Sequence, residues 1–593
     1  MTAPASHQDL ELPPSRRIDW REPPLRYIAL AVGVVAAWLV LQVILPNGLP
    51  LGVVVLGVVL GSLTGLTAIG LILIYQAARV INFAQAALGS VASVLAIQLV
   101  TEYDVNYFLG LILGVAVAAL MGAVIDMVII RRFMWAPRMI LTLATIGLAQ
   151  ILGGLELLIP RITGANTIPS AFDTPLSARF EIKPVLFTGN HLMIVLVSLV
   201  VIGGLGWFLI RTDVGTAIRA VADNGERARL MGIPVKRLST IVWVVAAVLS
   251  ALASTLAAPI QGLTPGAFSG SALLLPALAA AVLAKMTSLP GALAAGMGLG
   301  VLQQGVFWNT SRGTLTDLGM LVVILVALFL QRDELSRSSG GTTGSWVGAQ
   351  ETPPVPAALA LLPEIVWMRR GLYAGAAGIV AFMALTLGAR ELNLLGSVTV
   401  VYAVVAVSLV VLTGWTGQIS LGQFAIAGVG AVVAGYLLAD RHADLFLSML
   451  AAAAAGALVA LVVGLPALRI RGLFLAVTTL ALAVPMSSYF LNPTYFADQI
   501  PQQVERPVVF DRIDLADERM LFLFCVATLV LVLVAVRNLR ISRTGRVLVA
   551  TRDNEMAVQA RGVSLARSRL LGFVVSGALA GLGGALHVVV LQG

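Results

Sequence analysis

The sequence predicts an all-α, polytopic transmembrane protein. Of its 593 residues, 59% are hydrophobic and only 11% are charged, whereas a soluble chain carries about 25% charged residues. The apolar residues gather in runs of about 20, which is the length that crosses a bilayer as a helix. The alternating pattern of a membrane β-barrel is absent, so helices are the structure that satisfies the backbone in lipid.

The first part of the chain contains ten apolar runs. The first follows a polar tail, residues 1–26, and lacks a small-residue cleavage pattern, so we expect a retained span rather than a removed signal peptide. The eighth run is short, and we expect it to be re-entrant or to pair with the next one. The runs lie near residues 27–45, 51–74, 80–101, 107–130, 138–158, 191–210, 240–262, 272–284, 290–308 and 317–330.

A stretch rich in Ser, Gly, Thr and Pro separates these runs from a second set. This composition cannot bury itself, so residues 332–366 are predicted to be a linker between one half at 27–331 and another at 367–593. Seven apolar runs follow the linker, near residues 371–388, 393–413, 418–438, 445–467, 472–491, 520–536 and 570–592.

The basic residues predict the topology. If the Arg-rich tail is cytoplasmic, counting spans places all the basic loops on the cytoplasmic side, as the positive-inside rule requires. These loops contain Arg131 and Arg132, residues 211–239, Arg469 and Arg471, and residues 537–569. Topology therefore explains the net charge of +9, and nucleic acid is not an expected partner.

The two long basic loops form an internal repeat. Gly215 recurs as Gly545, an offset of 330 residues, and an earlier pair of polar segments starts at Val80 and Gln418, an offset of 338. Equal numbers of spans flank the loops in both parts, so we expect two parallel repeats that form a pseudo-dimer. Within the loops, Gly215, Asp223, Asn224 and Gly232 recur as Gly545, Asp553, Asn554 and Gly562.

Each long loop is predicted to form a short helix–turn–helix at the membrane face. We expect Asp223 and Asp553 to cap helix N-termini and Gly232 and Gly562 to form the turns. An amphipathic helix resting on anionic lipid headgroups is the simpler interpretation. The repetition favours docking to a cytosolic partner instead, because a two-fold motor needs two points of attachment.

Uncharged polar residues open one span in each half. Such groups at membrane depth face either a cavity or a neighbouring helix. A translocation path and hydrogen bonding between close-packed helices therefore both remain open. The candidates for the path are Asn82, Gln85, Gln418, Ser420 and Gln423, followed by Thr142, Thr145, Gln150, Thr478 and Thr479.

Several other activities find no support in the sequence. Charges within the apolar runs are scarce: Asp126 lies close to Arg131 and is expected to pair with it, and Glu156 lies near the outer end of its run. No row of gating arginines and no buried proton relay is apparent. No phosphate-binding loop is present either. The four histidines are scattered and Cys525 is the only cysteine, so we expect no catalytic residues, no metal site and no disulfide.

Several segments resemble the permeases of branched-chain amino acid ABC importers. Residues 412–431, 464–480 and 545–562 resemble the M-type (LivM) subunit. The first half resembles the H-type (LivH) subunit, through residues 81–85, 137–148, 211–239 and 288–292. Together these segments span both halves in the family's order.

The resemblance implies an H-type half fused to an M-type half in a bacterial inner membrane, with a cytoplasmic N-terminus. Its expected partners are two cytosolic ABC ATPase subunits, an extracytoplasmic solute-binding protein and membrane lipid. The ATPases would use the ATP, and this chain would bind no cofactor. The two basic loops would dock the ATPases, and the polar segments would lie at the solute path.

The sequence departs from the family at one point, and three alternative functions remain open. The M-type half lacks a counterpart of residues 272–331, so we expect it to be C-terminally incomplete. Amides, urea or sugars are alternative solutes. A gradient-driven secondary transporter is an alternative mechanism, although it leaves the two basic loops unexplained. A membrane-embedded enzyme would need a clustered catalytic set, which the sequence does not show.

Overall fold

The computed structural model describes residues 38–592, except 41, 134–135, 137, 164–173, 262–270, 331–361, 386–389, 469–472, 498, 502 and 511. The predicted N-terminal tail, most of the first apolar run, most of the linker, and Arg469 and Arg471 lie outside these residues. Within the described part, nine helices are long and apolar enough to cross a membrane. The prediction of an all-α polytopic protein is confirmed.

The first half consists of helices and one short β-hairpin, in which β1 and β2 are antiparallel. Side-chain caps start several helices, as where the side chain of Asn106 accepts a hydrogen bond from the N–H of Phe108. The elements are α2 (Leu51–Ala78), α3 (Gln85–Thr101), α4 (Tyr107–Val128), the 3-10 turn η1 (Ile130–Phe133), α5 (Arg138–Thr163), β1 (Arg179–Ile182), β2 (Val185–Thr188), α6 (Gly189–Arg211), α7 (Asp213–Asp223), α8 (Gly225–Leu230), α9 (Val235–Gln261), α10 (Ser271–Leu283), α11 (Leu289–Thr310) and α12 (Thr314–Leu330).

The second half follows a similar plan, and its first helix begins inside the last residues of the predicted linker. Two of its segments, η2 and η3, are π-helical. The elements are α15 (Pro363–Leu385), α16 (Arg390–Leu409), η2 (Val410–Trp415), α17 (Gln423–Ala439), α18 (Leu445–Ala467), α19 (Leu473–Pro485), η3 (Met486–Phe490), β3 (Val508–Val509), β4 (Ile513–Asp514), α20 (Glu518–Ile541), α21 (Arg543–Asp553), α22 (Glu555–Ala560) and α23 (Leu565–Leu591).

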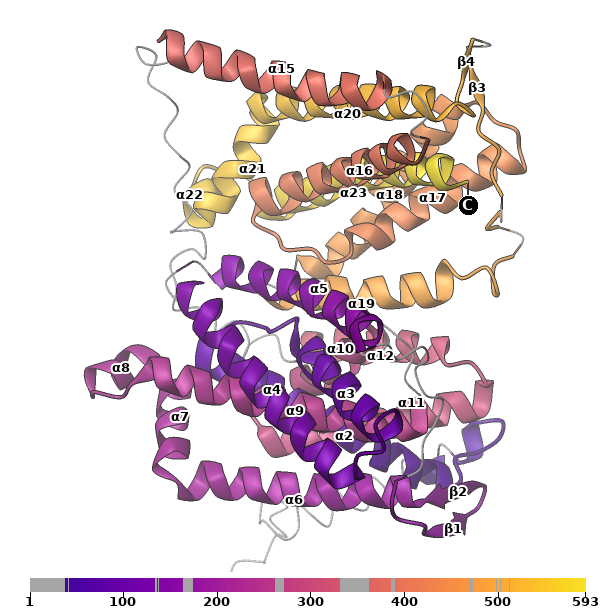
Figure 1. Ribbon diagram of the computed structural model, residues 1–593. Coiled ribbons are helices and arrows are strands. Elements are labelled where there is room, and N and C mark those ends of the chain that lie inside the picture. The colour runs from indigo at the N-terminus through magenta and orange to yellow at the C-terminus, as the bar shows by residue number, and fades with distance from the viewer. Residues whose placement is uncertain are drawn as a thin grey trace, which may run out of the picture.

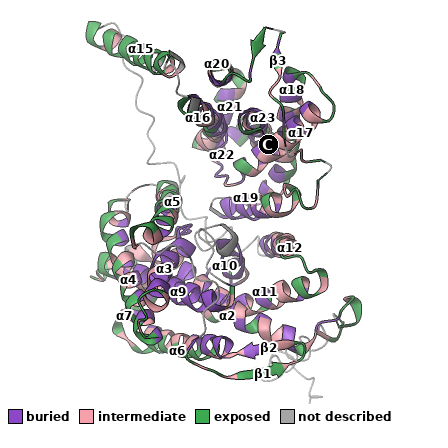
Figure 2. Ribbon diagram, turned by 45° about the vertical axis from the view of Figure 1, so that its right-hand side comes forward, coloured by how far each residue is buried: buried purple, intermediate pink, exposed green. Residues whose placement is uncertain are grey.

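Of the nine long apolar helices in the described part of the chain, α2, α9 and α23 are the most buried. In the most apolar window of α2 and of α9, 78% of the residues are buried, and in α23 61% are, against 22% in α6. Figure 2 shows this difference as buried central helices and exposed outer ones. Small residues allow the close packing: a Cβ added at Gly61 of α2 would lie 2.5 Å from the carbonyl oxygen of Gly296 in α11. Small residues at such close contacts are typical of helix packing in membranes.

The short elements lie at opposite ends of the molecule. Figure 1 shows α7 with α8, and α21 with α22, at one end, while the β1–β2 and β3–β4 hairpins lie at the other. The two halves meet where α10 and α12 of the first half contact α19 and η3 of the second (Figure 1). The hydroxyl of Thr314 donates to the hydroxyl of Tyr495 at 2.8 Å across this boundary.

Candidate functional site

The predicted polar segment of the first half is a break between α2 and α3. The helix α2 ends at Ala78, and Arg79 adopts a left-handed conformation with φ of 55°. Residues 80–84 are not helical, and the side-chain oxygen of Asn82 accepts a hydrogen bond from the N–H of Ala84 at 3.1 Å. A short polar side chain that bonds its own backbone in this way competes with helix formation. The break therefore has a local cause in the sequence.

The amides at this break are fully buried and bonded to neighbouring residues. Asn82 donates from Nδ2 to Oε1 of Gln85 at 3.2 Å, and Nε2 of Gln85 donates to the carbonyl oxygen of Ala246 in α9 at 3.0 Å. The hydroxyl of Ser250, also in α9, donates to the carbonyl oxygen of Gln85 at 2.6 Å. Asn82 and Gln85 are 0% exposed, so their amides join the break to α9.

The second half has an equivalent break between η2 and α17. Gly417 adopts the left-handed conformation here, with φ of 71°. The hydroxyl of Ser420 accepts from the N–H of Gly422 at 3.3 Å, as Asn82 accepts in the first half. The amide of Gln423 donates to the hydroxyl of Ser576 in α23, as Gln85 bonds α9.

One hydrogen bond recurs between the breaks and a neighbouring helix. The N–H of Phe83 donates to the hydroxyl of Thr145 in α5 at 3.3 Å. The N–H of Leu421 donates to the hydroxyl of Thr479 in α19 at 3.0 Å. Phe83 and Leu421 are separated by the same 338 residues as the two polar segments. Of the weaker candidates, Thr145 and Thr479 therefore occupy equivalent places.

The two breaks differ in how their polar atoms are satisfied. The Oε1 atoms of Gln418 and Gln423 are buried without a hydrogen-bond partner in the described part of the chain. A buried acceptor without a donor costs about 1–3 kcal/mol. These two oxygens are buried acceptors without a donor, whereas the amides of Asn82 and Gln85 are bonded to each other and to α9.

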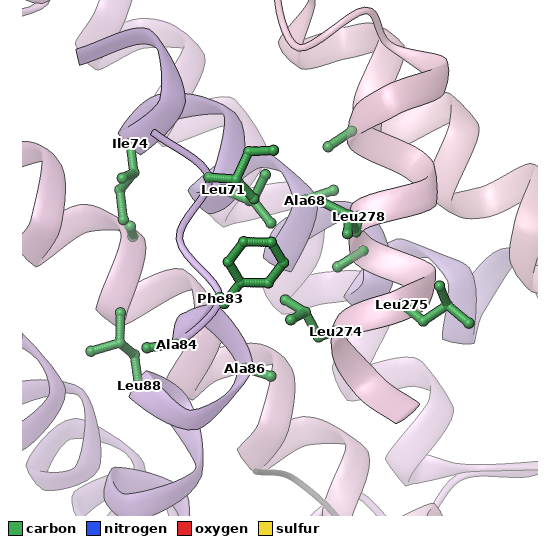
Figure 3. Packing of buried hydrophobic residues seen from close by; sticks show 14 of the residues in the cluster. Ala68, Leu71, Ile74, Phe83, Ala84, Ala86, Leu88, Leu274, Leu275 and Leu278 are labelled. Atoms are coloured by element: carbon green, nitrogen blue, oxygen red, sulfur yellow. The ribbon is translucent and has the colours of Figure 1, made fainter. Parts of the chain in front are cut away.

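Both breaks lie close to the boundary between the halves. Figure 3 shows the ring of Phe83 between Leu71 of α2 and Leu274 of α10, and α10 contacts α19 of the second half. The ring of Tyr75, in the last turn of α2, lies 6.2 Å from the ring of Phe474 in α19. The helix α19 in turn supplies the threonine that binds the second break.

The two long loops have the predicted helix–turn–helix form. Each contains an 11-residue helix, α7 or α21, followed by a 6-residue helix, α8 or α22. The N–H of Gly215 donates to the hydroxyl of Thr212, and the N–H of Gly545 donates to the hydroxyl of Ser542. Gly232 and Gly562 form the turns, with φ of 81° and 80°.

The predicted caps of the second helices are wrong by one residue. Asn224 accepts from the N–H of Arg227 at 3.0 Å, and Asn554 accepts from the N–H of Ala557 at 3.0 Å. Asp223 and Asp553 are the last residues of α7 and α21. Asn224 and Asn554 have extended backbones, which is the conformation that a capping residue adopts.

The expected pairing of Asp126 is confirmed. Its carboxylate is 0% exposed, lies 3.2 Å from Nε of Arg131, and accepts from the hydroxyls of Ser239 and Thr240 at 2.6 Å each. The described residues contain no group of three or more His, Cys, Asp or Glu that could hold a metal ion.

The comparisons with known proteins match both halves to one family. The family described as "Branched-chain amino acid transport system / permease component" matches residues 53–330 and again 391–593. The chain belongs to this family. The double match agrees with an H-type half followed by an M-type half.

Relatives named for both subunit types are similar to this permease. The probable branched-chain amino acid transport permease protein LivH of Methanocaldococcus jannaschii is 27% identical, over 41% of this chain and 77% of its own length. The LivH protein of Salmonella typhimurium is 26% identical, over 46% of this chain and 91% of its length. The LivM protein of that organism is 30% identical over 32% of this chain. This chain spans about half (51%) of the length of that LivM protein.

Two arginines of this permease that the sequence did not single out contact both the loops and the breaks. Arg79, at the first break, donates to the carbonyl oxygen of Ala222 in α7. Arg552, in α21, donates to the carbonyl oxygen of Gly414 in η2. Arg552 lies within one aligned segment and Arg79 directly precedes another, so comparing the residues at aligned positions would have identified them.

Proposed function

We propose that this protein is the membrane-spanning permease of an ABC importer for branched-chain or related amino acids. Its two halves act as a pseudo-dimer and pass the solute from an extracytoplasmic binding protein to the cytoplasm. Two cytosolic ATPase subunits supply the energy, and this chain binds no cofactor. The N-terminus is cytoplasmic, and the protein lies in a bacterial inner membrane.

The observation that carries this proposal is the pair of matching loops at one end of the molecule (Figure 1). Each loop exposes large apolar side chains. Leu230 and Met231 are 88% and 82% exposed, and Met556 is 81% exposed. Burying a Leu or Met side chain contributes about 1.5–3 kcal/mol. Two such loops at the cytoplasmic face fit two copies of a docking groove in a dimeric ATPase.

The equivalent breaks fit the solute path of the proposed pseudo-dimer. Each break separates two helices next to the boundary between the halves, and non-helical backbone with polar groups at such a boundary is where many transporters bind solute. The unpartnered oxygens of Gln418 and Gln423 can accept hydrogen bonds from the ammonium group of an amino acid. Asn82, Gln85 and Ser420 hold the shape of the two breaks.

Reconstitution tests this function directly. The chain is purified with candidate ATPase subunits and a candidate binding protein, placed in liposomes, and assayed for uptake of radiolabelled leucine with and without ATP. We expect uptake that needs ATP and all three partners. Uptake driven by an ion gradient without the ATPases would refute the proposal, whereas ATP-dependent uptake of an amide, urea or a sugar in place of leucine would change the solute only.

The docking loops are tested by changing their exposed side chains. The double substitution Leu230→Ser/Met231→Ser removes two large apolar contacts, so we expect it to weaken copurification of the ATPase about 100-fold. Leu230→Met/Met231→Leu keeps the apolar surface and serves as the matched control. Full ATPase binding by the serine variant would show that this loop is not a docking element.

A further inference from the structure

A guanidinium joins the first docking loop to the first helix break. Nη2 of Arg79 donates to the carbonyl oxygen of Ala222 at 2.6 Å, and it lies 3.5 Å from the carbonyl oxygen of Asp223. These carbonyls belong to the last turn of α7, where the helix leaves its carbonyls without helical partners. Arg79 itself is the first residue of the break. The end of the docking helix and the start of the break are therefore in direct contact.

The second half makes the same connection in the opposite direction. Nη1 of Arg552, in the last turn of α21, donates to the carbonyl oxygen of Gly414 in η2 at 2.6 Å. The carboxylate of Asp553 lies 2.8 Å from Nη2 of Arg552 and holds the guanidinium in place. In this half the donor arginine lies on the docking helix, and the acceptor carbonyl lies on the segment that leads into the break.

The repeat shows that the arginine lies at the break in the first half and on the docking helix in the second. The loop offset of 330 residues aligns Ala222 with Arg552, and the break offset of 338 aligns Arg79 with Gly417. Each half thus has one arginine, at one of the two aligned positions. Arg79 and Gly417 both adopt a left-handed backbone, with φ of 55° and 71°. Glycine takes this conformation without strain and arginine does not, so the first half keeps a strained arginine where its repeat has a glycine.

Apolar packing accompanies each arginine. In the second half, Leu548 and Val549 of α21 pack against Val411 and Trp415 of η2. In the first half, Ile218 and Val221 of α7 line a small pocket with Ala77, in the last turn of α2. Ile218 is 4% exposed and Leu548 is 1% exposed, and the two residues are aligned by the loop offset. Each docking helix therefore rests on the segment just before a break.

The far side of each break is joined to the same loop through another helix. Gln85 bonds Ala246 of α9, and Gln423 bonds Ser576 of α23. The helices α9 and α23 are the ones that directly follow the docking loops. A docking loop can thus act on its break from both sides. The arginine contact lies before the break, and the glutamine contact lies after it.

We propose that Arg79 and Arg552 are positioning residues that transmit movement of the docking loops to the helix breaks. This inference rests on the proposed function, because it assigns the loops to an ATPase. The bound arginine makes the last turn of the docking helix and the start of the break move together. Without it, the ATPase still docks and hydrolyses ATP, but less of its motion reaches the solute path.

The first test measures leucine taken up per ATP hydrolysed in proteoliposomes. We expect Arg79→Gly and Arg552→Ala each to lower this ratio about tenfold, as loss of a hydrogen bond from a charged donor implies, while ATPase copurification is unchanged. Arg441→Ala is the control, since this exposed arginine lies outside the docking loops and the breaks and donates to the hydroxyl of Tyr436. An unchanged ratio in both test variants would overturn the proposal.

The second test exchanges the positions of the arginine. The double variant Arg79→Gly/Ala222→Arg gives the first half the pattern of the second, a glycine at the left-handed position and a guanidinium on the docking helix. We expect it to recover at least about half of the uptake per ATP that Arg79→Gly loses, since the connection is restored in the opposite direction. A merely structural role for Arg79 predicts no rescue, and failure of the double variant to recover would count against transmission.

A third measurement does not depend on transport. Hydrogen–deuterium exchange of the chain alone in lipid nanodiscs follows the amides of residues 80–84. Arg79→Gly is expected to speed their exchange about tenfold, and Ala222→Arg is expected to reverse the effect. If the wild type takes up no solute but this pattern appears, the proposed function fails while the connection stands. If the exchange of residues 80–84 is unaffected by Arg79→Gly, the connection itself is refuted.

Discussion

Replacing Gly89 by Ala tests whether the helix break depends on close contact between α3 and α9. A Cβ added at Gly89 would lie 2.3 Å from the carbonyl carbon of Ser250 and 2.6 Å from the N of Ala251. Both are backbone atoms of α9 and cannot move aside as a side chain would. Ordinary contact begins at 3.4 Å, so the two helices must separate by about 1.1 Å.

This separation has a calculable effect on the break. The hydroxyl of Ser250 lies 2.6 Å from the carbonyl oxygen of Gln85, and a shift of this size lengthens the contact to about 3.7 Å, beyond hydrogen-bonding range. Overpacking costs about 1–3 kcal/mol and the lost hydrogen bond about 1 kcal/mol. We expect Gly89→Ala to destabilise the protein by about 2–4 kcal/mol.

The assay is thermal unfolding in detergent, followed by tryptophan fluorescence and by retention on size-exclusion chromatography. Gly147→Ala is the matched control, because a Cβ at Gly147 of α5 meets nothing within 4 Å. Alanine favours a helix over glycine by about 1 kcal/mol, so this control should melt at or above the wild-type temperature. If Gly89→Ala melts together with Gly147→Ala, the close contact between α3 and α9 does not exist and the reasoning fails.

Three further substitutions test other contacts by the same unfolding assay. Thr145→Val and Thr479→Val each leave one backbone N–H of a break unpaired, and we expect similar losses of about 1–3 kcal/mol; clearly unequal losses would mean that the breaks are not equivalent. Arg506→Ala removes the guanidinium that lies 2.8 Å from the buried carboxylate of Glu518 and should cost about 3–5 kcal/mol. Arg512→Ala, an exposed change on the same loop, is its control and should cost less than about 0.5 kcal/mol.

Much of the architecture could be predicted because lipid imposes simple constraints. The long apolar runs correspond to helices since every backbone group in the bilayer must bond within its own segment. The two long basic loops could be recognised because they recur at one offset and are too long and basic for turns. The breaks were visible as polar residues in apolar surroundings, and Asn82 and Ser420 cause them through local hydrogen bonds.

The misplaced caps show a limit of local sequence reasoning. Asp and Asn are nearly equal as N-caps, so the pair Asp223 and Asn224 contains two candidates and the sequence does not choose between them. The choice depends on where the preceding helix ends. In both loops α7 and α21 continue through the aspartate, and the asparagine is the residue whose extended backbone starts the next helix.

The boundary between the halves could not be predicted, because the apolar pattern carries no information about it. A helix that faces lipid and one that faces protein are equally apolar, since lipid tails resemble leucine side chains. The helix α10 is buried from Leu274 to Val282, whereas only seven of the 23 residues of α6 are buried, yet both read as continuous apolar runs. Polar contacts such as the one between Thr479 and Leu421 are what distinguish the buried helices. These contacts join residues far apart in the sequence, and only the repeat, by placing Thr145 and Thr479 at equivalent positions, gives a sequence-level sign of them.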